Sequence, residues 1–289
     1  MFSPYSKVFE EIFHRCSSYV CKDFSEIRGL NDRNGNESIY NFCLSTCTKI
    51  FDETIRVLKK VKYNGDVLLS GDLFFDRTTN IKIQSCINTS ISLKKKEIVI
   101  KNNSAILLSN AKLDKDNKVK NRIILLPIDG MASFANGIPC FGIVCAYQQL
   151  ENDEFITRQV VFFDPIKNDT YSFDDKNGCY VNNIKISNNK ILQEKNVNSI
   201  YVETYKQVSS FNINKLNSIS NTFIINNSIF YSICLLCTTK MNLIVCLQDK
   251  NKIIHDIISF CIKSANLNIH EFNEYMAIGE KDILQTLIR

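Results

Sequence analysis

The residue types best suited to chemistry follow an apolar stretch in the middle of the chain. Residues 123–126 (Ile-Ile-Leu-Leu) predict a buried strand, and Pro127 is expected to end it because proline cannot donate a hydrogen bond to a continuing sheet. Asp129 and Gly130 come next, and residues 131–134 predict the start of a helix. A carboxylate at a strand end, beside the free backbone N–H groups of a helix start, suits a cation and a phosphate group. We therefore expect a site at this turn.

The composition limits what this site can belong to. The chain has 289 residues, 45% of them hydrophobic, and a mean hydropathy of −0.09, which indicates a soluble globular protein with one large core or two tightly apposed lobes. The net charge of +5 is small and the basic residues are dispersed. The longest basic run, residues 94–96, is interpreted as a solvated turn, so the sequence carries no strong nucleic-acid signal.

The twelve cysteines are interpreted as buried thiols rather than as disulfides or a zinc site. No signal peptide is recognised, which argues against an oxidising compartment. Cys234 and Cys237 form a single C-x-x-C within an apolar run, and zinc would need a second pair at matching spacing. That run, residues 229–237, is too short to span a bilayer. We expect a reduced, soluble, cytoplasmic protein without a membrane segment.

Alternating helical and strand patterns surround the turn at Asp129 and would position it. Ser3 and Pro4 predict a helix start, and apolar residues follow at three- and four-residue spacing; a second amphipathic helix is predicted at 37–60. Strands are predicted at about 66–72, 141–149, 155–163, 171–173, 179–186, 197–205, 222–225 and 243–247, and further helices at about 73–91, 228–239 and 256–266.

The turn also resembles a known signature. Residues 126–134 are similar to the D-P-I-D-G-T-x-N-F motif of the inositol monophosphatase family, within the lithium-sensitive superfamily of Mg-dependent phosphatases. The resemblance covers residues 36–289, so residues 1–35 are predicted to be an N-terminal helical extension packed on the main domain. Further similar segments are residues 66–72 (D-L-V-T-x-x-D in the family), 137–147, 160–165, 177–187 (G-x-G-A-F-x-N-G…V-S) and 255–257 (W-D-hydrophobic).

This resemblance implies a fold and an assembly. The fold is a layered α/β structure of the inositol-monophosphatase type, in which helix and sheet layers alternate as an αβαβα sandwich. The assembly is a homodimer. Beyond residue 266 the family's E-A-G-G turn and the strand after it are not recognised, so the C-terminus is predicted to be shortened.

Counting the metal ligands that the resemblance implies indicates that the family's chemistry is damaged here. A first Mg²⁺ would need a glutamate and the first aspartate of the motif, where this chain has Asn102 and Leu126. A second Mg²⁺ would use that same aspartate position together with Asp129 and Asp256. The threonine that positions the attacking water is replaced by Met131. Because Mg²⁺ requires oxygen ligands, we expect its binding to be weak or absent.

The resemblance assigns further positions to catalysis and substrate contact. Asp72 would orient the water-positioning residue, and with Asp129 it completes a degenerate catalytic pair. The phosphate group would lie against Gly130, Met131 and Ala132. Asp249 would contact sugar hydroxyls of the substrate.

Two functional hypotheses and one structural interpretation remain open. The first hypothesis is a divergent family member with impaired or lost phosphomonoester hydrolysis, retained as a binding or regulatory protein for a small phosphorylated molecule. The alternative is an active Mg-dependent phosphomonoesterase that takes substitute ligands from acids such as Asp114 or Asp116. The structural interpretation is that Asp72, Asp129 and Asp256 only cap helices.

Overall fold

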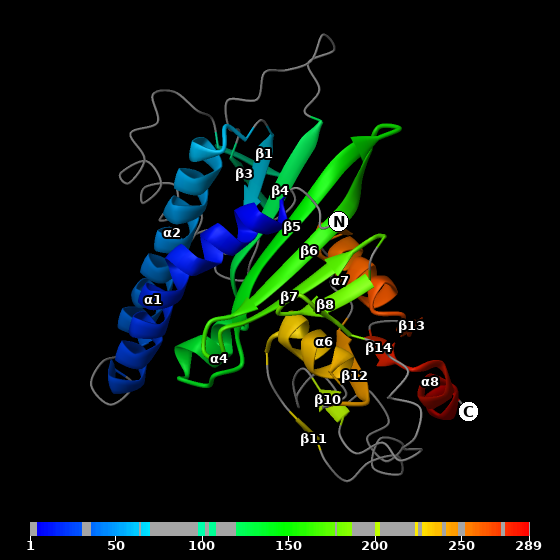
Figure 1. Cartoon of the computed structure of the whole chain (residues 1–289). Helices are drawn as coiled ribbons and strands as arrows, with labels where there is room; N and C mark the ends of the chain where they lie inside the picture. Colours follow the sequence, from blue (N-terminus) through cyan, green and yellow to red (C-terminus); the bar gives the residue numbers. More distant parts are fainter. Residues whose placement is uncertain are drawn as a thin grey trace.

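Two β-sheets alternate with layers of helices in this protein (Figure 1). The computed structural model places helices on both sides of the larger sheet. Its helices are α1 (Ser6–Leu30), α2 (Asn36–Lys60), α4 (Met131–Ala135), α6 (Ile229–Cys237), α7 (Lys252–Ser264) and α8 (Lys281–Ile288). The structure describes residues 5–30, 36–63, 65–69, 98–101, 104–107, 120–176, 178–186, 200–202, 223–224, 227–238, 241–247, 252–272 and 275–288.

Helices α1 and α2 form the first layer and lie together on one face of the large sheet (Figure 1). The apolar stripe of α1 is buried as its spacing predicts, and the Phe13 ring stacks on that of Phe163 in the sheet, with centroids 5.1 Å apart. The buried carboxylate of Asp23 on α1 accepts hydrogen bonds from Thr46 and Lys49 on α2, each at 2.8 Å. The predicted boundary at residue 35 falls between these two helices, and the division into an extension and a main domain stays a prediction.

The large sheet contains nine described strands. β1 and β4 run parallel, and the other neighbours are antiparallel. The expectation that Pro127 ends the central strand is wrong: the strand continues to Asp129, with an irregular register between Leu126 and Asp129 that accommodates the missing N–H group. In spatial order the strands are β2 (Ile98–Lys101), β3 (Ser104–Leu107), β1 (Asp66–Leu69), β4 (Asn121–Asp129), β5 (Gly142–Glu151), β6 (Glu154–Asp164), β7 (Asp169–Asp174), β8 (Gly178–Val181) and β9 (Ile184–Lys185).

The second sheet lies beyond α6 and α7, and α8 packs on its far side (Figure 1). Two of its strands and α8 follow residue 266, in the segment where the sequence shows neither the E-A-G-G turn of the family nor the strand after it. Helix α7 begins at Lys252, one turn before the predicted start at 256. In spatial order the strands are β11 (Phe223–Ile224), β10 (Ile200–Val202), β12 (Leu243–Leu247), β14 (Tyr275–Gly279) and β13 (Asn268–Glu271).

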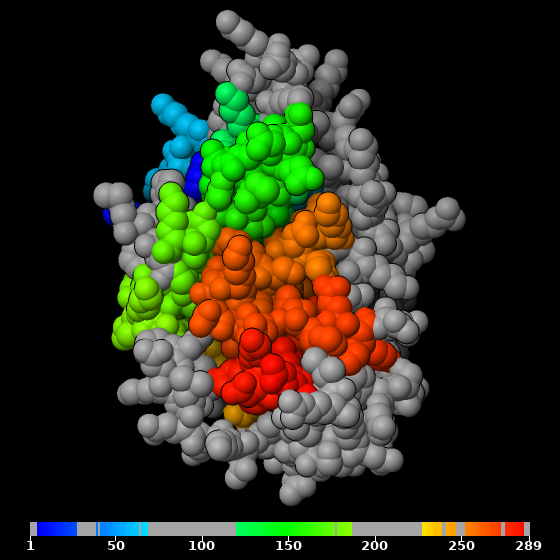
Figure 2. Space-filling view, turned by 90° about the vertical axis from the view of Figure 1, so that its right-hand side faces the viewer, coloured from blue at the N-terminus to red at the C-terminus, as the bar shows by residue number. Residues whose placement is uncertain are grey.

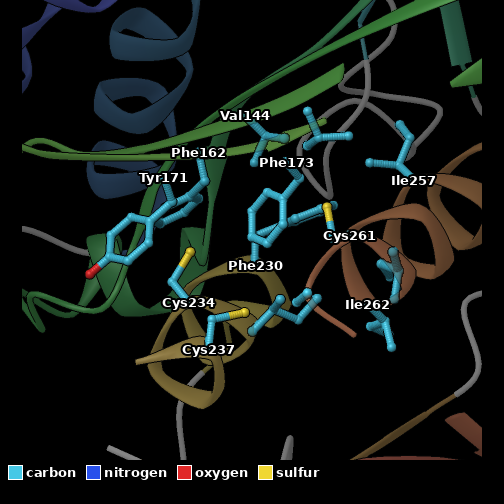
Figure 3. Close-up of a cluster of buried hydrophobic side chains, with 14 of the residues drawn as sticks. Val144, Phe162, Tyr171, Phe173, Phe230, Cys234, Cys237, Ile257, Cys261 and Ile262 are labelled. Atoms are coloured by element: carbon cyan, nitrogen blue, oxygen red, sulfur yellow. The ribbon is translucent and has the colours of Figure 1, made fainter. Parts of the chain in front are cut away.

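Successive residues of β4 point to opposite faces of the large sheet and so join two separate cores. Ile123 and Leu125 pack with α1 and α2, whereas Ile124 and Leu126 pack with α6, α7 and the second sheet. Figure 3 shows side chains of this second core, where sheet residues meet those of α6 and α7. The order helix, sheet, helix, sheet, helix confirms the predicted αβαβα sandwich.

Nine of the eleven cysteines in the described ranges are buried, as the sequence predicts, and Cys21 and Cys140 are partly exposed. Cys234 and Cys237 on α6 and Cys261 on α7 are buried in the second core (Figure 3), and every cysteine in the described ranges is a free thiol. Burial raises the pKa of the Cys261 thiol well above its ordinary value, which keeps it protonated and unreactive. Among the described residues, none of the helices has the length and apolar character needed to cross a bilayer.

Candidate functional site

Asp129 lies at the carboxyl end of β4, against the first turn of α6. One of its carboxylate oxygens accepts a hydrogen bond from the Ser228 hydroxyl and another, at 3.1 Å, from the backbone N–H of Phe230. Ser228 is the N-cap of α6, and its hydroxyl oxygen accepts from the backbone N–H of Tyr231 at 3.0 Å. Asp129 thus supplies a negative charge to the positive end of the α6 dipole.

The turn after Asp129 requires glycine. Gly130 has φ +85°, a left-handed conformation that costs an L-residue about 1–2 kcal/mol. A Cβ atom at Gly130 would lie 2.6 Å from the Cys140 carbonyl oxygen and 2.8 Å from the Ser228 Cβ. Because Gly130 has no side chain, Ser228 at the N-terminus of α6 can lie against this turn and reach Asp129.

The interpretation of Asp129 as a helix cap fits these contacts, and the helix concerned is α6 rather than the one that follows Asp129 in the chain. The N-cap of the following helix, α4, is Gly130, and that helix has no side-chain cap. Asp129 instead bonds the start of α6, about a hundred residues later in the chain. Met131 and Ala132 open α4, where backbone N–H groups of the first turn have no partner within a helix.

Two of the positions that the resemblance assigns to the metal site are core positions. Leu126 is 5% exposed and packs in the core between the large sheet and α6 and α7. Met131 is 9% exposed and packs in the opposite core, with α1 and α2. Neither side chain carries an oxygen ligand, so these positions contribute packing and no coordination.

Asp256 lies on α7, whereas Asp129 contacts the start of α6. Asp256 is exposed on α7, which borders β6 and the β5–β6 hairpin on the surface shown in Figure 2. Its charge acts on Arg122 at the amino end of β4: burial lowers the pKa of the Arg122 guanidinium to about 10, while Asp66 and Asp256 raise it. Seven strand residues, at about 3.3 Å each, separate Arg122 from Asp129, or about 23 Å. The contacts of the two acids thus lie on different elements, which disfavours a site shared by Asp129 and Asp256.

The remaining predicted site residues lie outside the described ranges. They are Asp72, Asn102, Asp249 and the substitute acids Asp114 and Asp116. Within the part of the chain that the structure describes, no three His, Cys, Asp or Glu side chains are grouped so that they could hold a metal ion.

A second polar cluster adjoins Asp129, and the sequence analysis missed it. Asp164 at the end of β6 is buried and accepts from the backbone N–H groups of Ile166 and Lys167, at 2.9 and 3.1 Å. The Lys167 ammonium lies 3.4 Å from the same carboxylate and hydrogen-bonds the Tyr231 hydroxyl in the first turn of α6.

The protonation states in this cluster are set by burial and by the ammonium group. Burial raises the pKa of Asp164, and the hydrogen bonds and charge of Lys167 oppose that rise. Burial likewise raises the pKa of Tyr231, against the hydrogen bond from Lys167. The sequence does contain a signal for this cluster. Asp164 follows an apolar strand, as Asp129 does, and Pro165 comes directly after it.

Comparison with known proteins finds likeness in structure alone. No family model and no curated protein matches the sequence. The solved structure of the extragenic suppressor protein suhB from Bartonella henselae matches with a TM-score of 0.63 at 11% identity, over 99% of this chain and 98% of that chain. Inositol monophosphatase II from Staphylococcus aureus matches with a TM-score of 0.63 at 11% identity, over 99% and 94% of the chains. An extragenic suppressor from Pyrococcus furiosus gives 0.56 at 14%, over 97% and 99%. The shared fold is thus the inositol monophosphatase fold.

Proposed function

We propose that this chain is a binding protein built on the inositol monophosphatase fold, in which phosphomonoester hydrolysis is impaired or lost. The observation that carries the proposal is Leu126. It stands where the resemblance requires a carboxylate shared by two metal ions, and it is a packed core residue. An aspartate there would have to place its charge in an apolar core unless metal ions neutralised it.

The donor set around Asp129 does not suit Mg²⁺. Mg²⁺ takes near-octahedral oxygen ligands, usually one or two carboxylates with waters and substrate phosphates. Among the described residues at this edge, Asp129 already accepts two hydrogen bonds from the start of α6, and Asp164 accepts two from its own turn. Because both carboxylates serve backbone groups, hydrolysis through a metal cluster is disfavoured at this edge.

A small phosphorylated molecule is the ligand class that we propose. Three features of the same sheet edge support it: the left-handed turn at Gly130, the first turn of α4 without a side-chain cap, and the ammonium group of Lys167. A 2'AMP-bound structure of the Staphylococcus aureus enzyme shows this chemical class in a protein of the same fold, with a TM-score of 0.56 at 11% identity.

The test compares binding with turnover in the same protein. The purified chain is titrated with 2'-AMP by calorimetry and then incubated with 2'-AMP and p-nitrophenyl phosphate, with and without Mg²⁺. We expect saturable binding that Lys167→Met weakens, and no release of phosphate above a protein-free control. Mg²⁺-dependent hydrolysis that Asp129→Asn abolishes would instead establish the active phosphatase.

Restoring the replaced groups sharpens the test. Leu126→Asp alone is expected to destabilise the fold by about 4 kcal/mol, because it introduces an unpaired charge into the core. The set Asn102→Glu, Leu126→Asp and Met131→Thr is expected to bind Mg²⁺ more tightly than the wild type and to gain measurable activity on p-nitrophenyl phosphate. A triple variant that binds no Mg²⁺ would show that the lost ligands are not those that the resemblance indicates.

The proposal includes a homodimer in the cytoplasm. The free thiols of the described residues suit a reducing compartment. Light scattering is expected to give twice the chain mass of 33.2 kDa. A mass equal to one chain would remove the dimer from the proposal and leave the ligand unaffected.

A further inference from the structure

A small cavity lies between the large sheet and the first turns of α1, on the face of the sheet opposite α6. Its volume is about 220 Å³. At about 30 Å³ per water molecule it has room for a small ligand, and it is smaller than the roughly 300–1,000 Å³ of sites for drug-sized molecules. Seven side chains line it: Ser6, Glu10, Val161, Thr170, Ser172, Asn182 and Asn183.

Most of the polar groups in this cavity are uncommitted. Asn182 is used by the β8–β9 turn, where its amide oxygen accepts from the backbone N–H of Thr170 and its amide nitrogen donates to Asp169. Within the described ranges, no hydrogen bond or ion pair is made by the side chains of Glu10, Thr170, Ser172 or Asn183. These four groups come from three different elements and surround one space.

The wall of the cavity continues into a buried amide. Gln159 lies two residues before Val161 on β6, so both face the same side of the sheet. It is 1% exposed and donates to the Ser6 hydroxyl at 2.6 Å. Its amide oxygen is buried and has no partner among the described residues. Gln159 does not itself line the cavity, and its hydrogen bond holds the Ser6 hydroxyl, which does, in place.

The chemistry of the lining selects a ligand class. We propose that this cavity binds a small polyhydroxylated molecule, such as a sugar or a short polyol. Hydroxyl and amide side chains both donate and accept, as the hydroxyls of a polyol do. None of the described side chains that line the cavity is basic, and the Glu10 carboxylate would repel an anion, so phosphorylated molecules are disfavoured.

The site is independent of the one proposed around Asp129. Val161 faces the core of α1 and α2, whereas α6, which Asp129 caps, packs on the opposite face. Binding of a polyol here is therefore expected to leave the binding of 2'-AMP unchanged.

The test is an NMR titration of the full ¹⁵N-labelled chain with glycerol, ribitol and D-glucose, with inorganic phosphate and spermidine as probes of other ligand classes. We expect saturable shifts in the backbone amides of Thr170, Ser172 and Asn183 with at least one polyol. The double variant T170V/S172A, which removes two hydroxyls, is expected to bind roughly tenfold more weakly. Ser25→Ala, a hydroxyl loss on the exposed part of α1, is the matched control and is expected to bind as the wild type does.

Three results would overturn the proposal: no saturable shift with any polyol, shifts confined to other parts of the chain, or stronger binding of phosphate or spermidine than of every polyol. If the double variant fails to fold, the map of shifted amides in the wild type decides the question.

Discussion

The two ends of β4 each carry a charged side chain, and the two charges are held by different kinds of contact. At the carboxyl end, Asp129 is bonded to a side-chain hydroxyl and a backbone N–H at the start of α6. At the amino end, Arg122 bonds Gln148, and its guanidinium lies over the Phe155 ring, 3.9 Å from the centroid. At one end a carboxylate accepts hydrogen bonds from the start of a helix, and at the other end a cation contacts side chains of the neighbouring strands.

The amino end is a row of polar side chains that crosses four strands. Asp66 is in register with Arg122, Arg122 with Gln148, and Gln148 with Thr157, whose hydroxyl accepts from the Gln148 amide at 2.9 Å. Burial raises the pKa of Asp66, and the charge of Arg122 lowers it. The difference between the ends shows that an acid at a strand end cannot be assigned as a metal ligand from its position alone. The groups in contact with its carboxylate decide that assignment.

The comparison predicts that the carboxyl end is the less tolerant of added volume. Gly130→Ala is expected to destabilise the fold by about 4 kcal/mol, because strain at φ +85° adds to the clash with Cys140 and Ser228. Gly178→Ala is the matched control: its φ is +93°, but the nearest atom to the new Cβ is 3.5 Å away, so about 1–2 kcal/mol is expected. Urea unfolding measures both, and equal losses would show that the approach of α6 does not depend on Gly130.

Removing the carboxylate tests its role as the anchor of α6. Asp129→Ala is expected to cost about 2–3 kcal/mol, since it leaves the Phe230 N–H without its charged acceptor and weakens the α6 cap. Asp129→Asn keeps an acceptor and is expected to cost about half as much. Hydrogen exchange should show faster opening of the first turn of α6 in the alanine variant. An unchanged exchange rate at Phe230 and Tyr231 would contradict this role.

The architecture was predictable from periodicity to a large extent, and the site to a small extent. The continuous apolar run at residues 123–126 predicts a buried strand, which the structure confirms. The helix predicted at 37–60 is confirmed, with its start one residue earlier. The partners of Asp129 could not be predicted, because Ser228 and Phe230 are about a hundred residues away and nothing local indicates the contact. The irregular register that carries the strand past Pro127 is likewise set by pairing with β5.

At the amino end the comparison predicts a dependence on pH. Arg122→Met is expected to cost about 1–2 kcal/mol at neutral pH, because it leaves the half-buried Asp66 carboxylate without a nearby cation. Without Arg122 the pKa of Asp66 rises further. A carboxyl whose folded pKa exceeds its unfolded value binds a proton first in the folded state, so stability rises as the pH falls through the folded value.

The cost of Arg122→Met should therefore shrink as the pH falls from 7 toward 3.8, the ordinary value for the carboxyl group. Urea unfolding at a series of pH values measures it. Arg158→Met is the control, because its partners Glu151 and Asp175 form exposed ion pairs at the surface. If the destabilisation caused by Arg122→Met instead grew toward acidic pH, Asp66 would not be the group whose protonation causes the pH dependence.

The smallest effect is expected for Asp256, and it separates this acid from Asp129. Asp256 is exposed on α7, and it is one of two acids, with Asp66, whose charges raise the pKa of Arg122. Asp256→Asn is expected to change the free energy of unfolding by less than about 0.5 kcal/mol, which is typical of exposed charges. If Asp129 and Asp256 shared a Mg²⁺ ion, that ion would stabilise the wild type, and either variant would remove the gain. We expect the melting temperature of the wild type to be the same with Mg²⁺ as with an equal ionic strength of Na⁺, and both variants to behave in the same way. A Mg²⁺-dependent rise in the wild type that both Asp129→Asn and Asp256→Asn abolish would place the two carboxylates on one ion and refute the separation of the two ends of β4.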